Sequence, residues 1–150
     1  MSYKELFDVR GKTALVTGAR KGIGFAIASA LAEHGANLIV VSSQQTPNDD
    51  LSKIAAQHGV TYTTFACDFR SRQDTLDLIE KVKDIKIDIL INNAGLANRA
   101  EALDHSDDLW DQTIEIDLTA PFILSREIGK GMANRGYGKI IFIASMWTFL

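Results

Sequence analysis

The sequence predicts an α/β fold in which helices cover both faces of a doubly wound parallel sheet. Apolar runs of strand length alternate with amphipathic runs of helix length from residue 13 onward. The run NLIVVSS, residues 37–43, is fully apolar in its middle, as expected for a strand covered on both faces. Each amphipathic run is long enough for the crossover that joins two parallel strands. Together these observations favour a Rossmann-like arrangement.

Five strands and four helices are predicted in alternation along one domain that takes in residues 1–150. The strands cover residues 13–17, 37–43, 60–68, 87–95 and 138–145, and the helices cover residues 22–34, 49–58, 71–85 and 109–135. Pro47 and Asn48 mark the start of the second helix, and Ser71 is expected to cap the third.

The first predicted helix carries apolar side chains at helical spacing. Ile23, Ile27 and Leu31 fall on one stripe, and Gly35 is a helix stop. Close approach of this helix to a sheet is expected at the alanines that lie between them, Ala26, Ala28, Ala30 and Ala32.

Composition excludes several classes of protein. The net charge of −3 leaves no basic surface for nucleic acid or anionic lipid. No apolar run reaches the roughly 20 residues that span a membrane, and the N-terminus lacks an apolar signal region. Cys67 is the single cysteine, so neither an intrachain disulfide nor a zinc cluster is expected. We expect a cytoplasmic protein with no nucleic-acid partner, no membrane partner and no metal.

Three glycines mark a candidate phosphate-binding loop. Gly18 directly follows the first strand, and Gly22 and Gly24 open the first helix. Glycine permits a tight turn and close approach to an anion, and the helix N-terminus adds unpaired N–H groups. The spacing G-x-x-x-G-x-G departs from the dinucleotide fingerprint G-x-G-x-x-G, and no Walker motif follows. For the glycines alone, a plain strand-to-helix turn is an equal alternative.

Polar residues at three further strand ends favour a nucleotide site. Ser42 and Ser43 follow the second strand, Asp68 ends the third, and NNAG, residues 92–95, ends the fourth. Each has an ordinary alternative as a loop or cap residue. Ligands of doubly wound sheets bind at the carboxyl ends of the strands, where all these residues fall. The sequence therefore predicts a dinucleotide-binding domain.

These motifs together resemble the short-chain dehydrogenase/reductase family. The resemblance rests on TGARKGIG, on the strand end at Asp68, on NNAG and on the strand that ends in Ser145. It extends over nearly the whole chain. The phrases GKIIFIASM and DLTAPFILSRE are most similar to the branch that acts on sugar acids, the gluconate and deoxygluconate dehydrogenases.

The resemblance implies roles for the matching residues. It places the pyrophosphate of a cofactor at residues 18–24, adenine at residues 68–69 and the adenosine ribose at residues 93–95, while Asn92 braces the sheet. The candidate cofactor-binding residues are Gly18, Arg20, Lys21, Gly22, Ile23, Gly24, Ser42, Ser43, Asp68, Phe69, Asn93, Ala94 and Gly95.

Two candidate catalytic residues also follow from the resemblance. Ser145 matches the family's catalytic serine, whose hydroxyl donates a hydrogen bond to the oxygen on which charge develops during hydride transfer. Asp117 stands where the family usually has an asparagine that helps kink its helix and offers its backbone carbonyl to a relay water. Asp117 keeps that carbonyl, whereas any role of the side chain would be altered.

The family's acid/base, a tyrosine in a Tyr-x-x-x-Lys motif beyond the serine, has no match. Tyr3 and Tyr62 do not fit, Tyr137 precedes Ser145, and Ile141 stands where the lysine is required. The sequence ends at an apolar stretch soon after Ser145. We therefore expect the C-terminal part of the fold to be missing and the 150-residue chain alone to be inactive.

The cofactor preference is expected to depend on the end of the second strand. NAD enzymes of this fold commonly place an acidic residue there, and this chain has Ser42, which does not repel a 2′-phosphate. Lys21 adds a cation near the same ribose, with a solvated surface charge as the alternative, and no arginine follows Ser43. The sequence favours NADP(H) over NAD(H).

We expect an NAD(P)-dependent oxidoreductase that transfers a hydride between nicotinamide and a secondary alcohol or ketone, with a sugar acid as a candidate substrate. The resemblance implies that the full-length enzyme is a homodimer or homotetramer, which associates through the residue 109–135 helix together with a neighbouring helix opened by the Tyr-x-x-x-Lys motif. Two alternatives remain, a catalytically incompetent nicotinamide-nucleotide-binding module and a purely structural subunit.

Overall fold

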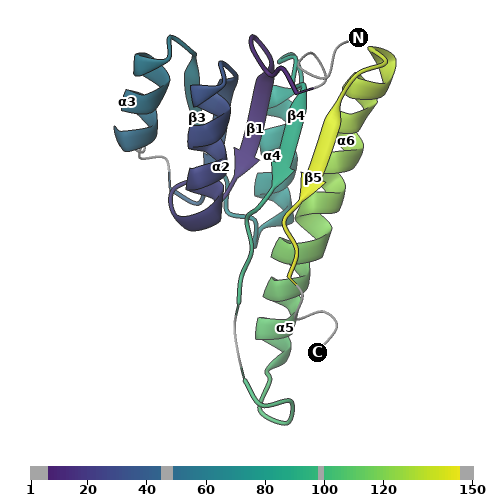
Figure 1. Cartoon of the computed structure of the whole chain (residues 1–150). Helices are drawn as coiled ribbons and strands as arrows, with labels where there is room; N and C mark the ends of the chain where they lie inside the picture. Colours follow the sequence, from purple (N-terminus) through teal and green to yellow (C-terminus); the bar gives the residue numbers. More distant parts are fainter. Residues whose placement is uncertain (1–6, 45–48, 98–99, 146–150) are drawn as a thin grey trace.

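The computed structural model describes residues 7–44, 49–97 and 100–145, and its elements alternate as predicted (Figure 1). The strands are β1 (Thr13–Thr17), β2 (Asn37–Ser42), β3 (Tyr62–Ala66), β4 (Ile89–Asn92) and β5 (Lys139–Phe142). The helices are α2 (Gly22–Glu33), α3 (Asp49–Gln57), α4 (Arg72–Val82), α5 (Asp107–Ile114) and α6 (Ala120–Asn134), with the π-helical turn η1 (Glu115–Thr119) between the last two.

The five strands form one parallel sheet in the order β3-β2-β1-β4-β5. The chain builds the sheet outward from β1 through β2 to β3, then returns to β4 on the other side of β1. This reversal confirms the predicted doubly wound topology. A crevice at the carboxyl ends of the strands is expected where the order reverses, between β1 and β4.

Helices cover the sheet on both sides (Figure 1). The side chains of the central strands alternate between the two faces. Leu15 belongs to the apolar cluster beneath α4 and α6, together with Leu78 and Leu124. Ala14 and Val16 belong to the cluster beneath α2 and α3. Two cores thus hold the strand ends in fixed positions at one edge of the sheet.

The apolar stripe predicted on the first helix is only partly right. Ile23 is 63% exposed, whereas Ala28 and Ala32 are fully buried against the sheet. Ile27 and Leu31 pack at the margin of the same core. The small side chains therefore form the buried face of α2, because the helix approaches β1 too closely for larger ones. Ala26 and Ala30, which were also expected on that face, are exposed.

The long helix predicted over residues 109–135 is interrupted by a π-helical turn. The N–H of Ala120 donates to the carbonyl of Glu115, five residues earlier. Pro121 has no N–H to direct at the carbonyl of Asp117, which an α-helix would pair with it. The interruption therefore coincides with the position that the sequence singled out.

The predicted cap at Ser71 is confirmed, since its hydroxyl accepts a hydrogen bond from the N–H of Asp74 at 3.2 Å. Pro47, Asn48 and Tyr3 lie outside the described residues. β5 forms one edge of the sheet, and all of its residues are exposed. Across the described ranges, no helix has the length and apolarity required to cross a membrane.

Candidate functional site

An open cleft of about 930 Å³ lies at the carboxyl ends of β1, β2, β3 and β4. It brings together most of the residues that the sequence predicted: Gly18, Arg20, Lys21, Gly22, Ser42, Ser43, Asp68, Phe69, Asn93, Ala94 and Gly95. Its lining also includes residues that the sequence did not single out for the site: Gln44, Cys67, Arg70, Leu96, Gln112 and Ile116. Ile23, Gly24, Asp117 and Ser145 are not part of the lining.

The glycines at the start of the cleft serve different physical purposes. Gly18 and Gly22 have φ values of +68° and +59°, which side chains rarely adopt. A Cβ atom on Gly18 would lie 2.9 Å from the Cα atom of Ala94. A Cβ atom on Gly22 would meet no atom within 4 Å. Gly18 is therefore needed to pack two loops together, whereas the space beside Gly22 is open.

Gly24 does not line the cleft but allows the elements behind the lining to pack closely. A Cβ atom there would lie 2.4 Å from Asn93 Nδ2 and 2.6 Å from the carbonyl oxygen of Gly18. The absence of a side chain lets the first turn of α2 pack against both strand-end loops. This explains why Gly24 does not line the cleft although it belongs to the glycine motif.

Thr17 joins the loop after β1 to the loop after β4. Its buried hydroxyl oxygen accepts hydrogen bonds from the backbone N–H groups of Asn93 and Ala94, each at 2.9 Å. The Asn93 side chain also binds the first loop, since its Nδ2 donates to the carbonyls of Thr17 at 2.9 Å and Gly18 at 3.2 Å. The sequence analysis missed Thr17. The available signal was a polar residue at the end of a buried strand, immediately before the glycines.

The first turn of α2 offers N–H groups without intrahelical partners beside the cleft. Lys21, the N-cap residue, makes no side-chain hydrogen bond to the helix, and no acidic residue lies in the first turn. The early N–H groups of a helix lack intrahelical partners and carry the positive end of its dipole. Arg20 and Lys21 add two cationic side chains to the lining of the same cleft. The N–H groups of the helix start and the two cationic side chains together favour the binding of an anion here.

The neighbouring wall is formed by the loops after β2 and β3. The Ser42 hydroxyl donates to the carbonyl of Gln44 at 2.6 Å, and the N–H of Cys67 donates to the carbonyl of Ser42 at 2.9 Å. Arg70 holds Asp68 with Nε at 2.9 Å from Oδ1 and Nη2 at 2.5 Å from Oδ2. These hydrogen bonds lower the pKa of the Asp68 carboxyl against the opposing effect of its partial burial.

Cys67 lines the cleft but is chemically unsuited to act there. Burial raises the pKa of its thiol to about 12, so the reactive thiolate is scarce at neutral pH. Within the described part of the chain, no three His, Cys, Asp or Glu side chains form a group that could hold a metal ion.

Asp117 braces the far end of the cleft from the π-helical turn. Its Oδ1 atom accepts a hydrogen bond from the N–H of Leu96 at 2.9 Å. A Cβ atom on Gly95 would lie 3.4 Å from the same oxygen, so the Gly95–Leu96 backbone passes close to the carboxylate. Asn92 ties the same strand end to α6, since its Nδ2 donates to Ser125 Oγ at 3.1 Å.

Comparison with known proteins agrees with this geometry. The sequence model of the short chain dehydrogenase family matches residues 12–150. The chain belongs to the short-chain dehydrogenase family. Its resemblance to that family is thereby confirmed, and the cleft at the strand ends lies where the fold binds its ligands.

Individual members of the family are similar over nearly the whole chain. A 2-dehydro-3-deoxy-D-gluconate 5-dehydrogenase of Pseudoalteromonas atlantica is 49% identical over 148 residues, which cover 97% of this chain and 58% of the relative. A crystal structure from Beutenbergia cavernae, assigned as an NAD(P)-dependent gluconate 5-dehydrogenase with bound NADP, is 33% identical with a TM-score of 0.87. It is matched over 96% of this chain and 58% of its own.

A further solved structure shares the fold at lower identity. The 3-oxoacyl-(acyl-carrier-protein) reductase of Agrobacterium tumefaciens, with NADP bound, is 28% identical with a TM-score of 0.89. The match covers 97% of this chain and 57% of that structure. The chain thus spans somewhat more than half the length of these family members.

Ser145 and the two described tyrosines take separate positions in this family fold. Ser145 lies three residues beyond the end of β5 and is exposed. Tyr62 is the first residue of β3, so it lies at the end of the sheet where the strands begin, opposite the cleft. Tyr137 lies near the same edge, where Lys12 Nζ stands 4.3 Å from the centre of its ring. Neither tyrosine can therefore reach the cleft.

Proposed function

We propose that the chain is the cofactor-binding portion of an NAD(P)-dependent oxidoreductase that interconverts a secondary alcohol and a ketone. The observation that carries this proposal is the convergence of four strand-end loops on one cleft, with an open space beside Gly22 at the N-terminus of α2. A plain strand-to-helix turn would not require the Thr17–Asn93 contact between separate loops. A purely structural subunit would not require an open cleft at the strand ends.

The residues present fit a dinucleotide. The uncapped N-terminus of α2, with Arg20 and Lys21, suits a pyrophosphate, and the Ser42–Ser43 and Asp68–Phe69 walls suit an adenosine. The Asn93–Gly95 turn would line the adenosine ribose and its surroundings. Ile23 and Gly24 would act through the helix start and its packing rather than by lining the cleft. When bound, the nicotinamide supplies or accepts the hydride.

The chain's own residues would position the reacting groups. The Ser145 hydroxyl would donate a hydrogen bond to the substrate oxygen as negative charge develops on it. Asp117 would hold the Gly95–Leu96 backbone in place, and its carbonyl, which Pro121 cannot engage, would be available to a water. Proton transfer is assigned to no residue of this chain, since it contains no Tyr-x-x-x-Lys motif. The chain alone is therefore expected to bind cofactor without turnover.

We infer a preference for NADP(H). Both solved structures described above carry bound NADP. In this chain no carboxylate occupies the end of β2, and the lining carboxylate of Asp68 is engaged by Arg70. A dianionic 2′-phosphate would therefore meet cations rather than a bare carboxylate.

The proposal of a sugar-acid substrate rests on the Pseudoalteromonas atlantica relative. The cytoplasmic location expected from the sequence stays a prediction.

Replacing Gly22 with valine should abolish NADPH binding while the protein stays folded. The new side chain would fill the open space where the pyrophosphate is expected. The matched control is Gly59→Val, because Gly59 has a similar φ of +66°, open space around it and a position outside the cleft. Fluorescence titration with NADPH measures the effect. Equal affinity in the two variants would contradict the assignment of the glycine loop.

Replacing Ser42 with aspartate should shift the preference from NADPH toward NADH. The ratio of the two dissociation constants is expected to change roughly tenfold, because a carboxylate at this position repels a nearby 2′-phosphate. Ser42→Asn is the matched control, since it has nearly the same shape without the charge. A wild-type chain that already favours NADH would show that the inferred preference is wrong.

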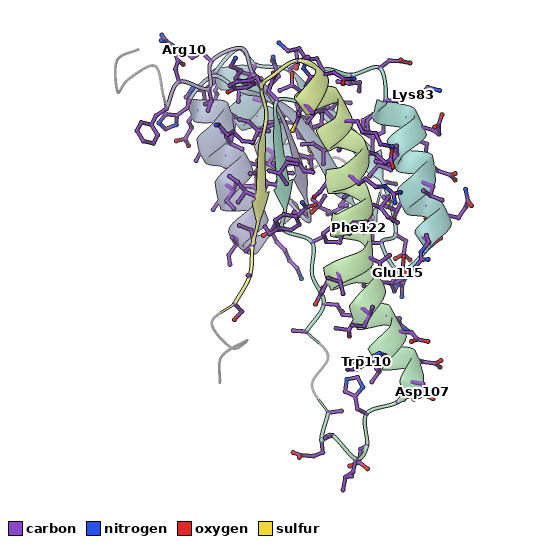
Figure 2. The ribbon with its side chains drawn as sticks, turned by 90° about the vertical axis from the view of Figure 1, so that its right-hand side faces the viewer. Arg10, Lys83, Asp107, Trp110, Glu115 and Phe122 are labelled. Atoms are coloured by element: carbon purple, nitrogen blue, oxygen red, sulfur yellow. The ribbon has the colours of Figure 1, made fainter. Side chains whose placement is uncertain are left out.

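We also propose that the chain associates with a second copy through the long helix. Trp110, Leu118 and Phe122 are 60%, 62% and 57% exposed along α5, η1 and α6, and Figure 2 labels the first and last of them. A paired symmetric contact would bury this surface on both copies.

Sedimentation equilibrium should show a dimer or tetramer for the wild-type chain and a monomer for Phe122→Glu. Leu103→Glu should leave the assembly intact, because Leu103 is exposed on the loop before α5 and not on the long helix itself. A wild-type monomer would refute the proposed association.

A further inference from the structure

An ion pair connects two walls of the cleft that are far apart in sequence. Arg72 Nε lies 3.1 Å from Glu115 Oε1, and Arg72 Nη2 lies 2.8 Å from Glu115 Oε2, which is a two-point contact. The residues are 43 positions apart. The pairs Lys83–Glu80 and Lys130–Glu127, in contrast, each join residues three positions apart on one helix.

The arginine end of the pair is fixed to the part of the lining formed by Asp68, Phe69 and Arg70, which we call the adenosine wall. Arg72 is the first residue of α4 and follows the cap residue Ser71. The N–H of Ser71 donates to the carbonyl of Asp68 at 2.9 Å, and Asp68 and Arg70 line the cleft. Arg72 itself lies outside the lining, so it can influence a ligand only through this wall.

The glutamate end of the pair is fixed to the part of the lining formed by Leu96, Gln112 and Ile116. Glu115 is the first residue of η1, and Figure 2 labels it where the long helix passes the beginning of α4. The next residue, Ile116, lines the cleft, and Asp117 holds the N–H of Leu96. Leu96 and Gln112 line the same wall. The position of Glu115 therefore bears on the whole far end of the cleft.

We propose that Arg72 and Glu115 are positioning residues that fix the separation of the two walls. The inference rests on the proposed function and adds to it, because a ligand that spans both walls would then bind a cleft that is already set to its length. Preorganisation of this kind contributes to affinity without any direct contact with the ligand. The side chain of Glu115 is 16% exposed and that of Arg72 is 62% exposed, so solvent screens the pair at the arginine end.

A local structural role and a positioning role make different predictions. Arg72 stands in the first turn of α4, where a cation is unfavourable toward the helix dipole. Arg72→Glu therefore favours α4 itself, while it places two carboxylates opposite each other across the walls. If the pair positions the walls, ligand affinity falls although the helix is not weakened.

The test compares ligand affinity with folding, because a positioning role lowers the first in variants that remain folded. The probe is NADPH, titrated calorimetrically against wild type, Arg72→Gln, Arg72→Glu and the charge-reversed double variant Arg72→Glu/Glu115→Arg. Lys83→Gln is the control, because it removes a cation that pairs with Glu80 at the other end of α4. Far-UV circular dichroism and urea unfolding report whether each variant folds.

Each single variant should bind NADPH about threefold to tenfold more weakly than wild type, and the double variant should recover to within about twofold. Each variant should be fully folded at the temperature of the titration, and Lys83→Gln should bind NADPH within about twofold of wild type.

A loss of NADPH affinity that accompanies partial unfolding of the single variants would overturn the inference in favour of a general structural role. Unchanged NADPH affinity, or a double variant no better than the singles, would also overturn it. These results would leave the proposed function standing, since wild type would still bind NADPH. A wild-type chain that does not bind NADPH would instead refute the proposed function, and this inference with it.

Discussion

The cleft depends on the buried hydroxyl of Thr17, which holds the end of β4 against the end of β1. Parallel strands in a doubly wound sheet leave their carboxyl ends as separate loops, and the order of this sheet reverses between these two strands. The Thr17 oxygen accepts two backbone N–H groups from the Asn93–Ala94 turn, and the Asn93 amide binds the backbone at Thr17 and Gly18 in return. This reciprocal contact converts two loops into one rigid wall.

The small residues follow from the same constraint. Because the two loops touch, a side chain on Gly18 would strike the Ala94 backbone, and one on Gly24 would strike Asn93. The helix α2 can then start directly at the junction, with its unpaired N–H groups facing the cleft. The glycine motif is thus mostly a packing requirement at positions 18 and 24. Its open position, Gly22, is where a ligand finds space.

Local patterns in the sequence were enough to predict the strands, the helices, the winding of the sheet and the residues at four strand ends. Ile23 was misplaced because its period matched a buried stripe, while the close approach of α2 to β1 buried Ala28 and Ala32 instead. The π-helical turn did not follow from the helical period, which continues on either side of it, although the resemblance implied a kink at position 117 and Pro121 marks the turn. Thr17 carried a local signal, a polar residue at the end of a buried strand, but its partners and those of the Arg72–Glu115 pair are distant in sequence and no local pattern encodes them.

The claim that Thr17 sets up the cleft is tested most directly by the NADPH dissociation constant of Thr17→Val beside that of Thr17→Ser. Valine keeps the shape of threonine but leaves the N–H groups of Asn93 and Ala94 without their acceptor, a cost of about 1–3 kcal/mol. Serine keeps the acceptor. We predict that the valine variant binds NADPH at least about tenfold more weakly while the serine variant stays within about twofold of wild type. Wild-type affinity in the valine variant would contradict this account of the cleft.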